Sequence, residues 1–494
     1  MTTIRRRAAL VAVTGALLAG AVACNSDKLA GLNKNPNYPS SVDKNLLFTQ
    51  AATAGPTLVL GENMQLRFSE LFSQHVAEYQ YPDEDAYNIR PATIDSYWQT
   101  LYSGPLEDLK QAYTQSAAIG DSARVASVLT MRAYIYQNAT DIWGDIPFSQ
   151  ANRGDEGIIK PVYDQQSVIY DSLLVELARA QKAATGAGAG FGASDPIYGG
   201  SKTAWHKFAA SLRARVAIRI SMKNPTRAAT ELTAVRDSGF ASNADNALIR
   251  WPGDGQNDNP YFTSSLTRDD FRVSLTLIDT LKSLNDPRLP IYAQPTQEWQ
   301  AALDDGDTTG VVKYAGLQNA LTAADAAELG YYASRIGTKF FARNAPQVLM
   351  DYAEYEFIMA EAAQRALIPA GGTTAAQYYY NGITASMQYQ GVSAPEIAAY
   401  LAQPRVIYTA GAAGLQQIAL QKWIALYGVG TEAWAEQRRT GFPSLQVGPE
   451  ASTTVIPRRL EYPQSEQSLN LANYNAAVAR QGANNKTTKI YWQP

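Results

Sequence analysis

The chain has 494 residues, of which 46% are hydrophobic and 18% are charged, and its formal net charge is −3. This acidic balance excludes the basic footprint that nucleic-acid-binding proteins need. The only two histidines, His75 and His206, have no second soft ligand beside them in the sequence, which argues against a zinc site. A chain of this length can form one large core or two to three domains.

The N-terminus has the layout of a secretory signal. Three arginines at residues 5–7 precede the mostly small or apolar residues 8–23, a stretch too short for a membrane span of about 20 residues. Cys24 follows directly and is the only cysteine of the chain. The segment resembles a bacterial lipobox, although the usual leucine three places before the cysteine is Ala21 here.

We therefore expect residues 1–23 to be a lipoprotein signal peptide and Cys24 to carry acyl chains. Acylation accounts for the lone thiol, because a single cysteine cannot form an internal disulfide in an exported protein. Several acyl chains would anchor the protein, since each buried methylene contributes about 0.8 kcal/mol. Residues 24–42, rich in Asn and Pro, would be the acylated tether. The alternatives are a plain signal peptide with an incidental cysteine and a twin-arginine export signal.

Apolar residues recur at helical spacing through most of the remaining chain, which predicts an all-α domain over residues 43–494. The predicted helices are 43–76, 93–109, 122–138, 163–183, 203–222, 228–237, 275–284, 346–367, 374–389, 415–427 and 431–439, with a last short one at 465–479. Helices that each expose an apolar face must stack to bury it. The sequence has no strict repeat. The expectation of a body built like a helical repeat therefore rests only on the spacing of the apolar residues.

Four stretches lack this spacing. Residues 79–91 and 251–265 combine aromatic and polar side chains, and residues 296–343 are rich in Gly, Asp and Ala with little periodicity. Loops of such length are usually functional or flexible. Residues 184–192 are glycine-rich, but a predicted helix precedes them where a dinucleotide fingerprint needs a strand. We therefore interpret this last stretch as a flexible loop.

Charged residues lie along two of the predicted helices. Arg213, Arg215 and Arg219 are expected to be solvated or paired with nearby acids. The acids of helix 346–367, such as Glu354 and Glu361, are expected to be surface charges or partners for arginines.

Several motifs resemble the SusD/RagB family of outer-membrane nutrient-uptake lipoproteins. They occur in the family's order and cover nearly the whole mature chain. The matching stretches are 143–147 (WGDIP), 205–220, 286–289 (DPRL), 345–363, 421–427 with 432–443, and 456–460 (IPRRL). Most of these residues, including Trp205, Trp423 and Trp434, are expected to pack and pin helices rather than bind a ligand.

The resemblance implies a tetratricopeptide-like fold of helix pairs with irregular loops on one side. It implies a non-catalytic lipoprotein on the outside of the outer membrane that captures oligosaccharides or peptides. Such a protein would cap a SusC-like TonB-dependent transporter and deliver the nutrient to it. No cofactor, metal or nucleic acid is expected, apart from the covalent lipid on Cys24.

The ligand surface of the family lies on variable loops, so no site residue is transferred by the resemblance. An exposed aromatic ring can cover the apolar face of a sugar, while polar side chains bond its hydroxyl groups. Residues 79–90 and 251–262 offer both kinds of side chain. The candidates for ligand binding are Tyr81, Tyr87, Asn88, Trp251, Asn257 and Tyr261, and structural packing is an equal alternative for each.

Two other functions stay open at this point. A glycoside hydrolase needs two carboxylates about 5–10 Å apart, and no acid pair stands out, although Asp83 with Asp85 or Glu354 with Glu361 would be available. No GxSxG, HExxH or P-loop motif supports another catalytic chemistry. The second alternative is a helical-repeat scaffold for assembly in the periplasm or at the outer membrane.

Overall fold

The computed structural model describes residues 42–494, and Lys44–Pro494 form one unit. The predicted signal peptide, the lipidation of Cys24 and nearly all of the tether therefore lie outside the described residues. Within residues 42–494, every helix is too short or too polar to cross a bilayer.

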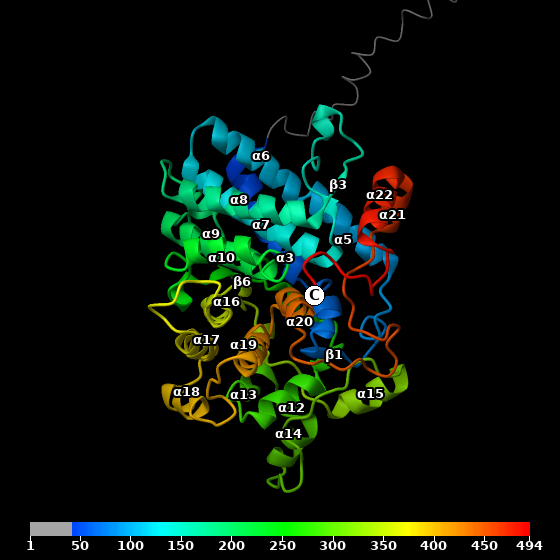
Figure 1. The fold of residues 1–494 in the computed structure, drawn as a ribbon. Helices are drawn as coiled ribbons and strands as arrows, with labels where there is room; N and C mark the ends of the chain where they lie inside the picture. Colours follow the sequence, from blue (N-terminus) through cyan, green and yellow to red (C-terminus); the bar gives the residue numbers. More distant parts are fainter. Residues whose placement is uncertain (1–41) are drawn as a thin grey trace, which may run out of the picture. The chain divides into compact units, whose positions relative to one another are not determined.

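The first half of this unit is a stack of long helices (Figure 1). Helices α6 to α10 contact one another in chain order, and α3 packs on α6. This order of contacts is the helix-pair stacking that the spacing predicts. The helices are α3 (Lys44–Leu60), α5 (Pro91–Ser103), α6 (Pro105–Ala118), α7 (Ser122–Trp143), α8 (Gln166–Ala184), α9 (Lys202–Arg219) and α10 (Pro225–Val235).

The second half continues the stacking after a region of short helices. Helix α16 contacts α9 of the first half, and α17, α19 and α20 follow. These helices are α16 (Tyr352–Gln364), α17 (Ala375–Gln390), α18 (Ala394–Leu401), α19 (Ala412–Ala425), α20 (Gly430–Thr440), α21 (Gln464–Leu469) and α22 (Leu471–Gln481). The short helices are α4 (Glu70–Phe72), α11 (Pro260–Ser265), α12 (Leu275–Ser283), α13 (Leu289–Tyr292), α14 (Gln297–Asp304) and α15 (Ala323–Tyr332).

Short strands join segments that are distant in sequence. Three antiparallel two-stranded ladders are present among the described residues. They pair β1 (Val76–Glu78) with β5 (Phe271–Val273), β2 (Ile146–Pro147) with β3 (Tyr163–Asp164), and β4 (Ala247–Ile249) with β6 (Gln347–Met350). The β1–β5 ladder brings residues 79–91, which follow β1, close to residues 266–270, which precede β5.

The all-α prediction is confirmed, with corrections at several boundaries. The predicted helix 93–109 is two helices, since Gly104 and Pro105 end α5 and begin α6. Residues 347–350 form strand β6, and α16 begins after Asp351, whose carboxylate accepts from the backbone N–H of Glu354. The predicted helix 43–76 ends as α3 at Leu60, before a π-helical turn at Gln65–Ser69.

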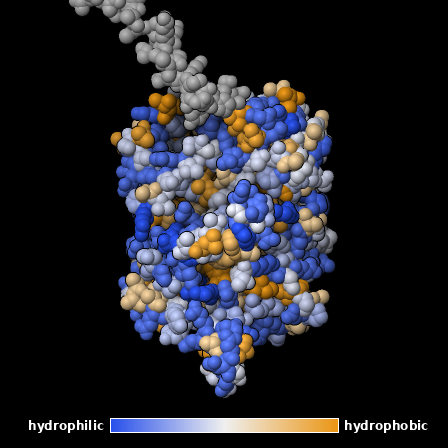
Figure 2. Space-filling view, turned by 180° about the vertical axis from the view of Figure 1, so that it is seen from behind, coloured by the Kyte–Doolittle hydropathy of each residue, from blue (hydrophilic) through white to orange (hydrophobic). Residues whose placement is uncertain are grey.

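The core runs through both halves of the stack. Helix α7 is buried along almost its whole length because α3, α6, α8 and α9 all pack on it. Trp143, Trp205, Trp423 and Trp434 are almost fully buried, which confirms their packing role. On the face that is hidden in Figure 1, the surface is mostly hydrophilic and carries small groups of hydrophobic residues (Figure 2).

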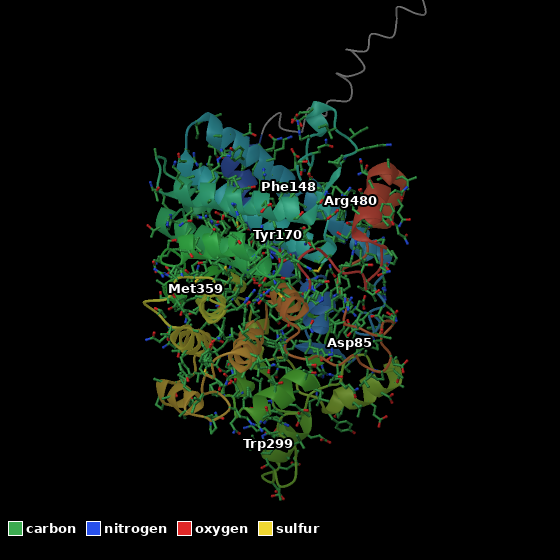
Figure 3. All side chains as sticks on the ribbon, in the orientation of Figure 1. Asp85, Phe148, Tyr170, Trp299, Met359 and Arg480 are labelled. Carbon is green, nitrogen blue, oxygen red and sulfur yellow. The ribbon has the colours of Figure 1, made fainter. Side chains whose placement is uncertain are left out.

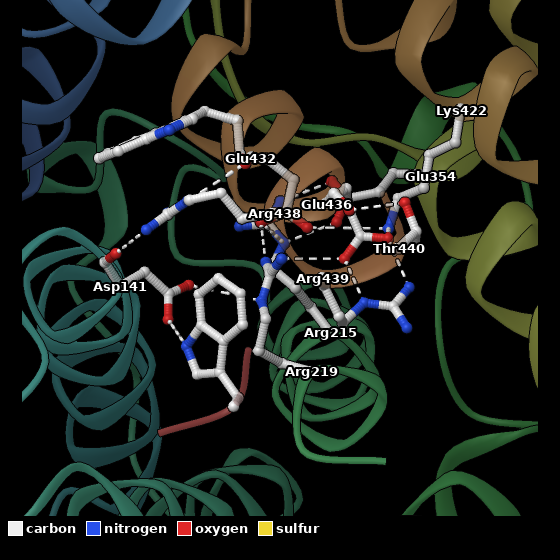
Figure 4. A network of polar contacts seen from close by, with 12 residues as sticks. Asp141, Arg215, Arg219, Glu354, Lys422, Glu432, Glu436, Arg438, Arg439 and Thr440 are labelled. Atoms are coloured by element: carbon white, nitrogen blue, oxygen red, sulfur yellow. Dashed lines mark hydrogen bonds and ion pairs between the residues drawn. The ribbon is translucent and has the colours of Figure 1, made fainter. Parts of the chain in front are cut away.

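A network of buried charges connects the two halves (Figure 4). Arg215 Nη2 lies 2.6 Å from Glu354 Oε2, and Arg219 Nη1 lies 2.9 Å from Glu436 Oε1. The predicted pairing of these arginines is thus confirmed, but their solvated alternative and the surface position of Glu354 are wrong. Further members of the network are Asp141, Glu361, Lys422, Glu432 and Arg439.

Candidate ligand-binding site

The loop that follows β1 is held by a buried carboxylate. The backbone N–H of Asp85 donates to Glu78 Oε2 at 3.1 Å, and the backbone N–H of Glu78 donates to Asp85 Oδ2 at 3.3 Å. Asp85 also accepts from Asn319 Nδ2 at 2.7 Å and from the backbone N–H of Ala320 at 3.0 Å. Figure 3 shows Asp85 close to β1. These bonds close the loop 79–90 on itself and fix it to the segment that precedes α15.

Burial perturbs both carboxyl groups at the base of this loop. Desolvation, together with the neighbouring charge of Asp85, raises the pKa of Glu78 to about 10. Desolvation likewise raises the pKa of Asp85 to about 7, although its hydrogen bonds oppose the shift. Burial away from water disfavours the charged form of a carboxyl group and so favours the protonated form. The loop is therefore anchored by acids that hold protons near neutral pH.

Tyr81 projects from the closed loop into solvent. Its side chain is 61% exposed, and the guanidinium of Arg268 lies 5.3 Å from its ring centroid. Arg268 in turn pairs with Asp270, which precedes β5. A cavity of about 360 Å³ lies here, lined by Tyr81, Arg268, Arg67, Glu84, Arg90 and Thr93 among others.

A second cavity of about 390 Å³ adjoins the first, because Arg268 lines both. One wall is apolar, and the rest carries hydroxyl, amide and charged groups. Arg335 pairs with Asp269 at 2.8 Å on its rim. The apolar wall consists of Leu66, Phe271, Ile336 and Phe341, and the polar lining includes Ser264, Gln294 and Thr338. We call the two cavities together the Arg268 site.

A group of tyrosines extends the aromatic surface beside β1. The guanidinium of buried Arg272 lies 3.8 Å from the ring centroid of Tyr79, and its Nε donates to the carbonyl oxygen of Gly330 at 2.8 Å. A side chain at position 330 would overlap Tyr79, so only glycine permits this approach. Tyr331 and Tyr332, which follow it, are 55% and 46% exposed with ring centroids 5.2 Å apart.

Of the three candidate ligand contacts in residues 79–90, two are exposed and one is buried. Tyr81 and Asn88 are exposed, and Tyr81 lines the Arg268 site. Tyr87 is only 1% exposed and packs edge-on against Phe72 at 5.5 Å. Its ring therefore offers no face to a ligand in this conformation. For Tyr87 the structure therefore favours packing over ligand contact.

The three candidates in residues 251–262 also differ in exposure. Asn257 is exposed, but its amide and backbone N–H both donate to Asp254, so its polar groups serve the loop. Trp251 is half-buried against the core. Tyr261 is 7% exposed and donates its hydroxyl to the carbonyl oxygen of Leu60 at 2.8 Å, which favours packing for this residue too. None of these three lines the Arg268 site.

Sequence reasoning missed several residues in and near the Arg268 site. Arg268 and Arg335 lie outside the chosen ranges, and Tyr331 and Tyr332 fall within the stretch 296–343 that shows little periodicity. That stretch in fact holds α14 and α15, and Figure 3 shows Trp299 on α14. A pair of adjacent tyrosines after a short alanine-rich run was the available signal, but only the fold places them beside Tyr79.

The geometry of the Arg268 site suits binding rather than bond cleavage. Asp269 and Asp270 are each paired with arginine, so neither carboxylate is free to act as a general acid or base. Exposed rings, paired charges and hydroxyl groups are the surface that recognises a sugar through stacking and hydrogen bonds. Within residues 42–494, no cluster of His, Asp and Glu has the arrangement of a metal site.

Comparisons with known proteins identify the family. A family model described as SusD-like, starch-binding and associating with the outer membrane matches residues 36–463. A structure named as a chitin-binding protein is 27% identical, with a TM-score of 0.78, and the match covers 91% of this chain and 99% of that one. A chitin-binding SusD homologue from Flavobacterium johnsoniae is 25% identical, with a TM-score of 0.79 and coverage of 91% and 98%.

A third structure shares the fold. It is a SusD homologue from Bacteroides ovatus ATCC 8483, 24% identical, with a TM-score of 0.80 over 91% of this chain and 99% of that one. No curated protein matches the chain. Because the family model spans most of the sequence and the helical stack superposes over nine tenths of it, the chain belongs to the SusD-like family, whose members are binding proteins rather than enzymes.

Proposed function

We propose that this protein captures oligosaccharide nutrients at the Arg268 site and delivers them to a SusC-like TonB-dependent transporter. In this proposal Cys24 carries the lipid that holds the protein on the outer face of the outer membrane. The observation that carries the binding claim is the meeting of exposed Tyr81, Arg268 and two adjoining cavities at one place. The resemblance of the whole chain to transporter-associated lipoproteins supports the delivery step.

Chitin oligosaccharides are the first ligands to test. Two structures similar to this chain are named as chitin-binding. An N-acetyl sugar has a methyl group that would suit the apolar wall of the larger cavity, beside Phe271 and Ile336. Its amide and hydroxyl groups would bond to Ser264, Gln294 and Thr338. Asn88, Trp251 and Asn257 stay in the proposal as contacts for a longer oligosaccharide that extends from the Arg268 site.

The test is a calorimetric titration of the purified protein with chitohexaose and with cellohexaose, which lacks the N-acetyl groups. Chitohexaose should bind more tightly. Tyr81→Ala should lower its affinity about tenfold, equivalent to about 1.4 kcal/mol, because the exposed ring is the stacking platform. Tyr81→Phe keeps the ring and should keep the affinity within about threefold.

Tyr491→Ala is the matched control, since Tyr491 is exposed and does not line the Arg268 site. It should bind chitohexaose as the unaltered protein does. If neither oligosaccharide binds, or if Tyr81→Ala binds as tightly as the control, the Arg268 site is not the sugar site.

A further inference from the structure

A third cavity, of about 530 Å³, lies at the end of α20. It is formed by Gln437, Arg438 and Gly441, by the segment that follows α20, and by the last residues of the chain. It shares no lining residue with the Arg268 site. Its volume lies within the range of about 300–1,000 Å³ that small-molecule sites occupy. The cavity is therefore large enough for a ligand of its own.

The charged side chains that line this cavity are all positive. Arg438, Arg458 and Lys489 line it, and none of the lining residues is Asp or Glu. Among the described residues, the side-chain hydrogen bonds of these three cations all go to main-chain oxygens. Arg438 Nη1 donates to Asp141 O at 2.8 Å and Arg458 O at 2.7 Å, Arg458 Nη1 donates to Thr487 O at 3.3 Å, and Lys489 Nζ donates to Pro494 O.

Arg438 is the fixed member of the three. Its side chain is held between two indoles, with the guanidinium 3.6 Å from the ring centroid of Trp434 and 4.9 Å from that of Trp492. The residue is only 8% exposed, and its Nη2 has no hydrogen-bond partner among residues 42–494. A buried N–H group without a partner costs free energy that an acceptor would recover.

The pKa of Arg438 is lowered, as expected for a buried guanidinium that lacks a paired carboxylate. Burial lowers its pKa to about 9, the charge of Asp141 opposes this shift, and the positive charge of Arg219 adds to it. Glu432 and Glu436, the carboxylates on the same helix, pair with Arg219. An anion in the cavity would stabilise the charged guanidinium and restore the pKa of Arg438.

We propose that this cavity binds the carboxylate or sulfate group of an acidic saccharide, at a site separate from the Arg268 site. Arginine guanidinium groups bind such planar or multidentate anions through paired N–H donors. Lys489, which is exposed, adds a third positive charge to the lining. Gln437, Gln446 and Thr454 line the same cavity and supply amide and hydroxyl groups for the sugar hydroxyls.

The experiment is a calorimetric titration with three probes: trigalacturonate, its fully methyl-esterified form, and sodium sulfate. Trigalacturonate should bind at least tenfold more tightly than its ester, which keeps the sugar rings but lacks the charge. Its affinity should fall when salt rises from about 0.05 to about 0.2 M, because the rim charges are screened. The double variant Arg458→Gln/Lys489→Gln should lose at least tenfold in affinity for trigalacturonate.

Two controls keep the result decisive. Lys223→Gln removes an exposed lysine between α9 and α10 that does not line the cavity, and it should bind trigalacturonate normally. An unchanged melting temperature of the double variant shows that it is folded. Equal binding of the acid and its ester, normal binding by the double variant, or binding of inorganic sulfate alone would each overturn the proposal. Tyr81→Ala should leave this binding unchanged, so the two sites are tested separately.

Discussion

At the scale of single residues, the site depends on side chains whose charge is decided by burial. Asp85 is an example. Its hydrogen bonds anchor the loop that contains Tyr81, and its pKa is raised from 3.8 to about 7. Between these two values the folded protein binds a proton that the unfolded chain has released. Stability contributed by this group is therefore present below about pH 4 and is lost as pH rises toward about 7.

The corresponding prediction concerns Asp85→Asn, which cannot ionise. Because the titrating group is gone, its free energy of unfolding should decline less between about pH 4 and pH 7 than that of the unaltered protein. Chemical denaturation at a series of pH values measures both slopes. Asp307→Asn is the control, since Asp307 is exposed and its pKa is lowered by Thr309 rather than raised. Parallel curves for Asp85→Asn and the unaltered protein would contradict the role given to this carboxyl group.

At the scale of helices, stacking explains the fold, and buried charges fix the position of each helix in the stack. Glu432 on α20 pairs with Arg219 on α9 at 2.5 Å and lies 3.7 Å from Lys422 on α19. All three residues are almost fully buried. Hydrophobic contacts alone would allow one helix to shift along its neighbour. An ion pair between two helices forms at one relative position only.

The prediction at this scale is that Glu432→Gln lowers the free energy of unfolding by about 3–5 kcal/mol, because buried Arg219 and Lys422 lose a counter-charge. Denaturant unfolding measures the loss. The matched control is Glu156→Gln, which breaks an exposed pair with Arg153 at 2.5 Å and should leave the free energy of unfolding nearly unchanged, because solvent screens the pair. Similar losses in the two variants would show that the network does not hold the helices.

At the scale of the whole molecule, the protein is proposed to act as the lid of a transporter. An affinity pull-down of the tagged protein from detergent-solubilised outer membranes should recover a TonB-dependent transporter in near-equal amount, as mass spectrometry would show. Protease added to intact cells should cut the protein, because the proposal places it on the outer face of the outer membrane. Recovery of periplasmic assembly factors alone, together with protection from protease, would favour the scaffold function instead.

The sequence alone was sufficient for the class of fold and for the family. Helical spacing predicted almost every long helix, because an amphipathic helix records its buried face in residues three and four apart. Motifs such as residues 286–289 and 456–460 indicated the family, and the comparisons confirm it. Strand β6 was missed, because a four-residue buried strand before a helix has no periodicity of its own.

The candidate site was decided by tertiary structure. Tyr81, Tyr87 and Tyr261 have similar surroundings in the sequence, yet only Tyr81 is exposed, since burial depends on contacts with residues far along the chain. Arg268 reaches Tyr81 because β5 pairs with β1, nearly two hundred positions apart in sequence. The sequence by itself therefore determined which segments become helices and loops. Only long-range packing determined which side chains of those loops meet at the surface, where a ligand can reach them.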